Sequence, residues 1–127
     1  MTYKVFIIST QKDADLVLEL ARRLEKAGIK VLARKALASE AIDNRIRRSL
    51  GESNEVFVLL TDKSLNNERV TVLLGAAFGL HKPITPILVG VREHELPSMV
   101  RGMRHLKYAE VDDYISELRS RSEKVAA

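Results

Sequence analysis

The polar residues that can do chemistry gather in three loops, residues 9–13, 34–39 and 61–67. Each loop follows a short apolar segment of the kind that forms a buried strand. The loops offer hydroxyl, carboxylate and guanidinium groups, which can bind a phosphate or the hydroxyl groups of a sugar. They also contain serine and aspartate residues, which in other settings act as a nucleophile or accept a phosphoryl group.

The residues around the first loop argue against three specific chemistries. A phosphoryl-accepting receiver site needs an acidic pair after the first strand, but the chain has Ile8, Ser9 and Thr10 there. A flavin or dinucleotide site needs a glycine-rich turn, and residues 9–12 contain no glycine. Ser9 has no G-x-S-x-G elbow around it, so the pattern favours an N-capping serine over a hydrolase nucleophile.

The spacing of apolar residues predicts strands that alternate with helices. The expected strands are residues 3–8, 29–33, 56–60, 82–89 and 106–108. The expected helices are residues 12–27, 40–50, a third one from about Val70, and 111–121. Ser39 is the expected N-cap of the second helix, Asn66 or Asn67 that of the third, and Gly28 ends the first.

This alternation implies right-handed βαβ crossovers and a parallel sheet. The predicted fold class is α/β, a flavodoxin-like three-layer sandwich with a five-stranded parallel sheet in the order 2-1-3-4-5 and helices on both faces. Ligands of such sheets bind beyond the carboxyl ends of the strands, at the switch between strands one and three. Pro86 is a local difficulty, because proline lacks the donor that a sheet ladder uses.

Length and composition bound the class of protein. The chain has 127 residues, which predicts one domain over residues 1–127, with a frayed end from about residue 120. Hydrophobic residues make up 46% and charged residues 30%, with no run long enough for a membrane span. The apolar segment at residues 3–8 is too short for a secretory signal, so we expect a cytoplasmic location. Because Cys is absent and the three His are scattered, we expect no metal site.

The formal charge of +4 and the pI near 9.5 raise the alternative of a nucleic-acid partner. The basic residues of the second helix, Arg45, Arg47 and Arg48, do not form one stripe. The chain has only three Tyr and three Phe, so it lacks a stacking platform for single strands. We therefore expect no specific nucleic-acid recognition.

Two segments carry a family resemblance: VFIISTQKD at residues 5–13 and GAAFGLHKPI at residues 75–84. They resemble a Toll/interleukin receptor (TIR) domain of the bacterial type, and the resemblance extends from residue 3 to about residue 118. It implies NAD or a related nucleotide as a ligand. With the loop positions, it points to the nucleotide-binding residues Ser9, Thr10, Asp13, Arg34, Thr61, Ser64 and Arg69.

The same resemblance directs attention to Leu73. TIR domains that cleave NAD are similar to one another in a glutamate within E-L-G on the third helix, and Leu73 stands at that position; Arg69 replaces the usual aromatic residue. Leucine cannot stabilise the oxocarbenium-like charge that develops as nicotinamide leaves, a loss of ~3 to 4 kcal/mol. Glu68 precedes Leu73 by five residues and points about 140° away around the helix, so we interpret it as a partner of the helix dipole.

Two functions follow as expectations. The preferred one is a signalling or assembly module that binds other TIR domains, or a nucleotide, without cleaving it, with no catalytic residue and no bound cofactor. Self-association would use the apolar residues Leu37, Ala38 and Ile42. The alternative is an NAD+ glycohydrolase that takes its acid from elsewhere, such as Glu68 or a neighbouring copy.

Overall fold

The computed structural model describes residues 2–32 and 42–126. Five parallel strands form one sheet in the order β2-β1-β3-β4-β5. The strands are β1 (Lys4–Ile8), β2 (Lys30–Val31), β3 (Glu55–Leu60), β4 (Ile84–Leu88) and β5 (Leu106–Lys107). The predicted fold class and strand order are confirmed.

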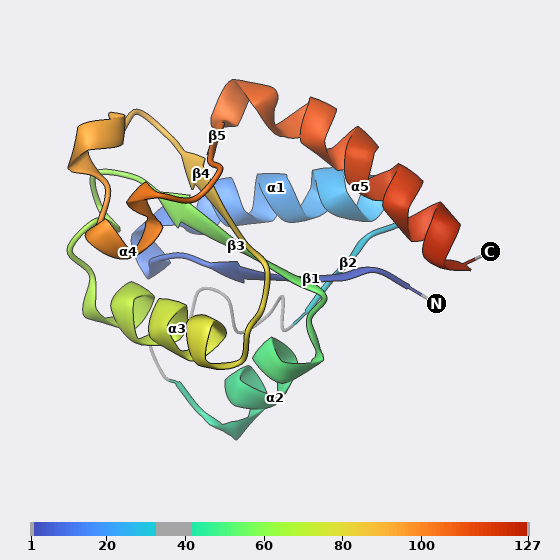
Figure 1. Ribbon diagram of the computed structural model, residues 1–127, viewed down its shortest axis with the longest axis horizontal. Helices are drawn as coiled ribbons and strands as arrows, with labels where there is room; N and C mark the ends of the chain where they lie inside the picture. The colour runs from blue at the N-terminus through green and yellow to red at the C-terminus, as the bar shows by residue number, and fades with distance from the viewer. Residues whose placement is uncertain (1, 33–41, 127) are drawn as a thin grey trace.

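Helices cover both faces of this sheet (Figure 1). The helices are α1 (Ala14–Lys26), α2 (Asn44–Glu52), α3 (Glu68–Gly79), α4 (Ser98–Arg101) and α5 (Val111–Ala126). Short 3₁₀ turns are η1 (Gln11–Asp13), η3 (Glu93–Glu95) and η4 (Tyr108–Glu110). Helices α1 and α5 lie together on one face, and α2 and α3 lie on the other, which gives three layers. Among the described residues, no helix combines the length and apolar content that crossing a membrane requires.

The two central strands, β1 and β3, form the middle of the core. Every residue of β3 is buried, as expected for a strand that is covered on both faces. Phe6 and Phe57 are among the largest fully buried side chains. The register pairs Ile8 with Val58, so the chain leaves β1 and β3 at the same edge of the sheet. The residues that follow these two strands are therefore neighbours in space.

A buried carboxylate joins the layers at the opposite, amino end of the sheet. Glu55, which is 2% exposed, accepts hydrogen bonds from Tyr3 Oη (2.6 Å), Thr85 Oγ1 (2.7 Å) and Tyr114 Oη (2.6 Å). These donors come from the start of the chain, from β4 and from α5. Burial and the hydrogen bond to Glu55 raise the pKa of the Tyr114 phenol. This network fixes the amino end and lies away from the predicted ligand site.

Pro86 lies inside β4, opposite Val58, and the predicted strand is confirmed there. The N–H of Val89 donates to Leu60 O on β3. Backbone N–H groups point alternately to the two neighbouring strands, so an N–H at position 86 would point toward β5. The pairing with β5 begins only at Ile87. Proline is tolerated here because no β5 residue is paired at that level.

The predicted start of α2 is wrong. We expected the helix to begin at Glu40 after Ser39, but the chain is not helical at Ile42 and Asp43, and α2 begins at Asn44. Asp43 is the N-cap, and its Oδ1 accepts the Ile46 N–H at 3.0 Å. Ser39 lies outside the described residues. Both residues are of a capping type, and the apolar spacing from Ile42 fits either start, so the sequence did not distinguish them.

The other differences concern element ends. The first helix, expected from Lys12, begins as the turn η1, and the last helix continues to Ala126 instead of ending at Arg121. The linker after β4 contains η3 and the short helix α4. The C-terminal glycine of α1 is confirmed, because Gly28 has φ +80°, a conformation that glycine adopts without strain.

The position of the α2 cap can be tested by alanine substitution. Asp43→Ala removes the acceptor for the Ile46 N–H and is expected to lower the free energy of unfolding by about 1 kcal/mol, measured by urea denaturation. Ser39→Ala is the matched comparison and should leave stability nearly unchanged. A loss with Ser39→Ala and none with Asp43→Ala would restore the start predicted from the sequence.

Candidate functional site

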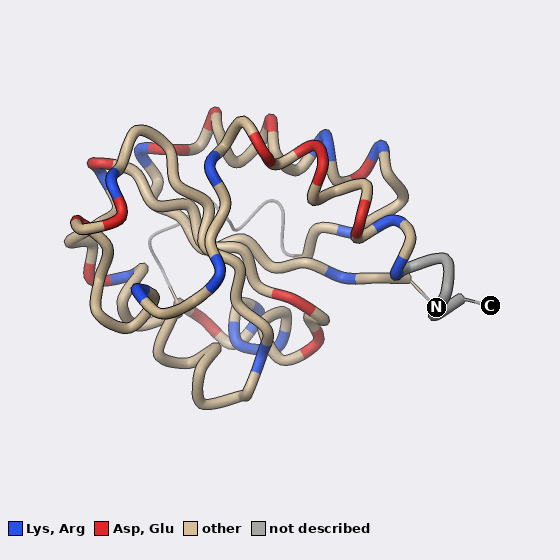
Figure 2. The backbone as a smooth tube through the Cα atoms, turned by 45° about the horizontal axis from the view of Figure 1, so that its top comes forward, with Lys and Arg blue, Asp and Glu red and all other residues tan. Residues whose placement is uncertain are grey.

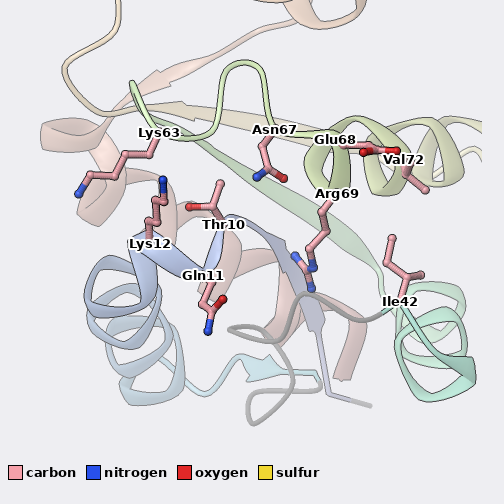
Figure 3. Close-up of a pocket in the computed structure, with 9 residues that line it drawn as sticks. All are labelled: Thr10, Gln11, Lys12, Ile42, Lys63, Asn67, Glu68, Arg69 and Val72. Carbon is pink, nitrogen blue, oxygen red and sulfur yellow. The ribbon is translucent and has the colours of Figure 1, made fainter.

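A cavity of about 370 Å³ opens at the carboxyl ends of β1 and β3, at the predicted switch point of the sheet (Figure 3). Four segments of the described chain contribute to its walls: the turn after β1, the residue before the N-cap of α2, the loop after β3, and the first turns of α3. The described lining residues are Thr10, Gln11, Lys12, Ile42, Lys63, Asn67, Glu68, Arg69 and Val72. The cavity size lies within the range of small-molecule sites, about 300–1,000 Å³.

A buried aspartate links the two loops behind the cavity. Asp13 is 4% exposed, and its Oδ2 accepts hydrogen bonds from Thr61 Oγ1 at 2.8 Å and from Thr10 Oγ1 at 3.2 Å. Thr61 follows β3 directly, whereas Thr10 and Asp13 follow β1. A buried carboxylate needs such donors, because an unpaired one costs several kcal/mol. The link therefore holds the two loops in a fixed relation.

The loop after β3 is a closed turn built by hydroxyl groups. Thr61 N–H donates to Ser64 Oγ at 2.8 Å, and Ser64 Oγ donates to Leu59 O at 2.9 Å. Lys63 N–H donates to Thr61 Oγ1 at 3.1 Å. Asn67 then caps α3, because its Oδ1 accepts the N–H of Val70 at 3.1 Å, which confirms one of the two predicted caps. Lys63 and Asn67 of this loop both line the cavity.

The inner wall of the cavity is formed by Arg69, which is 8% exposed. Its Nη1 donates to Ser9 O at 2.8 Å, so the side chain ties α3 to the end of β1. Leu73 lies one turn further along α3, is 2% exposed and belongs to the hydrophobic core. It is not among the residues that line the cavity.

The described residues among those predicted for the site fall into two groups, one that lines the cavity and one that lies behind it. Thr10 and Arg69 line the cavity, whereas four buried residues lie behind it and hold the loops: Ser9, Asp13, Thr61 and Ser64. The predicted capping role of Ser9 is wrong, because Thr10 precedes η1 and Ser9 Oγ is buried with no hydrogen-bond partner among the described residues. Arg34 lies outside the described residues.

Several lining residues were not predicted. Gln11, Lys12, Lys63 and Asn67 belong to the loops that the sequence indicated, but the direction of a loop side chain cannot be read from residue type. Glu68 reaches the cavity wall although it is exposed and lies on another side of α3 from Leu73. Among the described residues, the acid at the cavity is therefore Glu68, which we had interpreted as a partner of the helix dipole.

The described part of the chain gives no sign of a metal centre or of a single charged face. It contains no group of three or more His, Asp or Glu residues that could hold a metal ion. Figure 2 shows acidic and basic residues mixed along the helices, so the excess positive charge is distributed over the molecule.

A comparison with protein-family models decides the family. The model described as TIR domain matches residues 5–122. The chain belongs to the TIR domain family. A comparison of this TIR domain with curated proteins found no match.

Solved structures show how widely this TIR fold is shared. The TIR domain of the Toll-related receptor TRR-2 from Hydra magnipapillata is 24% identical, with a TM-score of 0.71 over 99% of this chain and 100% of that one. The CMP N-glycosidase BcmB of Clostridium botulinum is 15% identical, with a TM-score of 0.61 over 91% and 97%. The TIR domains of the activated Roq1 resistosome are 17% identical, with a TM-score of 0.61 over 94% and 80%. At these identities the likeness shows the fold.

The Asp13 link can be tested with an isosteric change. Thr61→Val removes a donor to buried Asp13 and the acceptor for Lys63 N–H, and it should lower the free energy of unfolding by about 1 to 3 kcal/mol in urea denaturation. Thr71→Val on the exposed side of α3 is the matched control and should cost less than about 0.5 kcal/mol. Equal losses for the two variants would contradict the structural role of the link.

Proposed function

We propose that this TIR domain binds a nucleotide without cleaving it and assembles with other TIR domains. The observation that carries the proposal is Leu73, a buried aliphatic residue at the position where the NAD-cleaving TIR pattern has a glutamate. A leucine side chain offers no charge to the transition state and no acceptor to ribose hydroxyls. The position of the pattern's acid therefore holds a residue that cannot stabilise the transition-state charge, while the cavity in front of it has groups that can bind a ligand.

The binding half of the proposal is supported by the chemistry of the cavity walls. Gln11 and Asn67 supply side-chain amides, Thr10 supplies a hydroxyl group, and Lys12 and Lys63 supply positive charge. Ile42 and Val72 add an apolar surface. Ligand sites of this kind combine apolar walls with a few placed polar groups. A nucleotide offers a matching set: an apolar base, sugar hydroxyls and phosphate.

The assembly half is supported by the outer side of α3. No charged residue occurs between Arg69 and His81, and three large apolar side chains of this stretch are exposed: Val72 (51%), Phe78 (39%) and Leu80 (50%). Exposed apolar groups gathered on one element indicate a contact surface. The Roq1 TIR domains, which share the fold, belong to a resistosome. Of the apolar residues predicted for self-association, Ile42 lies on the cavity, and Leu37 and Ala38 lie outside the described residues.

A cleaving enzyme is the second candidate, and the position of Glu68 favours it. Its side chain is the one acid among the described residues that line the cavity. The structurally similar BcmB is a CMP N-glycosidase, so the fold is compatible with cleavage of a glycosidic bond. In this alternative Glu68 stabilises the positive charge on the sugar as the base leaves.

Nicotinamide release from NAD separates the two candidates. The native chain at high concentration should release nicotinamide no faster than the heat-denatured chain, and Glu68→Gln should behave identically, because the proposed function needs no acid. Glu117→Gln, at an exposed residue of α5, is the matched control for charge. The cleaving enzyme would be established instead by three results together. The native chain would release nicotinamide, Glu68→Gln would lower the rate by a factor of about 100 or more, and Glu117→Gln would retain it.

Self-association can be measured by sedimentation of the native chain over a range of concentrations. We expect the average mass to rise with concentration and Leu80→Lys to suppress the rise, since a buried lysine in an apolar contact costs free energy. Leu18→Lys places the same charge on α1 at a side chain that is 44% exposed, and it should have no effect. A monomer at all concentrations, or equal effects of the two variants, would remove the assembly half of the proposal.

A further inference from the structure

The cavity has two chemically different ends. Figure 3 shows the ammonium groups of Lys12 and Lys63 at one end, whereas Ile42 and Val72 lie at the other end beside Glu68. Arg69 and the side chains of the turn after β1 occupy the space between them. A ligand that fills the cavity must therefore be anionic at one end and able to contact apolar groups at the other.

The fold brings the two lysines together from segments that are distant in sequence. Lys12 belongs to η1 after β1, and Lys63 belongs to the turn after β3. The hydrogen bond between Asp13 and Thr61 joins these segments within a residue or two of each lysine, and Lys63 N–H donates to Thr61 Oγ1. These hydrogen bonds fix the backbone near Lys12 and Lys63, although both lysine side chains are exposed.

The charges of Lys12 and Lys63 are not paired with any described acidic residue. Within the described part of the chain, neither Lys12 nor Lys63 forms a salt bridge, and the acid of the cavity, Glu68, lies toward the apolar end. Two like charges at one end of a cavity repel each other, and a bound dianion relieves that repulsion. Lysine binds phosphate as a point charge, without the geometric demand of a bidentate arginine contact.

We propose that the cavity binds a nucleoside monophosphate with its phosphate between Lys12 and Lys63 and its base against Ile42 and Val72. The sugar then lies beside Arg69, within reach of the Thr10 hydroxyl group and the Gln11 and Asn67 amides. The cavity volume of about 370 Å³ lies in the lower part of the range for ligand sites and is enough for a mononucleotide. This inference rests on the proposed nucleotide-binding function and adds the ligand class and its orientation.

Calorimetric titration of the full chain tests the proposal with matched probes: adenosine and AMP, cytidine and CMP, and inorganic phosphate. We expect each monophosphate to bind at least about tenfold more tightly than its nucleoside, since hydrogen bonds to charged groups are worth that much. The Lys12→Gln/Lys63→Gln double variant should remove this difference. The Lys26→Gln/Lys30→Gln variant, with the same change in charge at exposed residues of α1 and β2, should retain it.

The possible failures are distinguishable. If nucleoside and monophosphate bind equally and the double variant changes nothing, the lysine pair is not a phosphate site, but nucleotide binding stands. If inorganic phosphate binds as tightly as the monophosphates, the base contact with Ile42 and Val72 is wrong. If none of the nucleosides or nucleotides binds, the nucleotide-binding half of the proposed function falls together with this inference.

Discussion

The hydrogen bond between Asp13 and Thr61 is the interaction on which the candidate site depends. The parallel register of β1 and β3 brings their ends together, but register alone does not fix the conformation of the loops that follow. The buried carboxylate does so, because it can remain in the interior only while the hydroxyl groups of Thr61 and Thr10 satisfy it. Those contacts place Lys12, Lys63 and the start of α3 around one cavity.

A second constraint comes from the nearly continuous apolar character of α3. The helix buries Val70, Leu73, Leu74 and Ala77 against the sheet and leaves other apolar residues exposed. Leu73 is thus explained by packing. The proposed absence of cleavage concerns the same residue, because the resemblance to NAD-cleaving TIR domains would place a glutamate there. The acid that remains at the cavity, Glu68, is in the first helical turn and exposed, where a carboxylate also interacts favourably with the helix dipole.

The sequence predicted those features that depend on periodicity. The buried run that became β3, the apolar stripe of α3 and the cap Asn67 are local patterns with direct physical causes, and the strand order follows from the alternation of elements. Features that depend on contacts between residues distant in sequence could not be predicted. Nothing near Glu55 indicates that Tyr3 and Tyr114 donate to it, and the choice of Asp43 over Ser39 as a cap needs the position of α2 against the sheet. The sequence predicted which loops form the site. It did not predict which side chains of these loops line the cavity, because that depends on the direction of each side chain.

Nucleotide binding at the carboxyl ends of β1 and β3 can be observed residue by residue in a titration followed by two-dimensional amide NMR. With AMP as the ligand, we expect the resonances of Gln11, Lys12, Lys63 and Asn67 to shift together along one saturable curve. The amides of Thr85 and Tyr114, at the amino end of the sheet, should stay in place. Shifts confined to the amino end, or no saturable shift at the four cavity residues, would contradict nucleotide binding at this cavity.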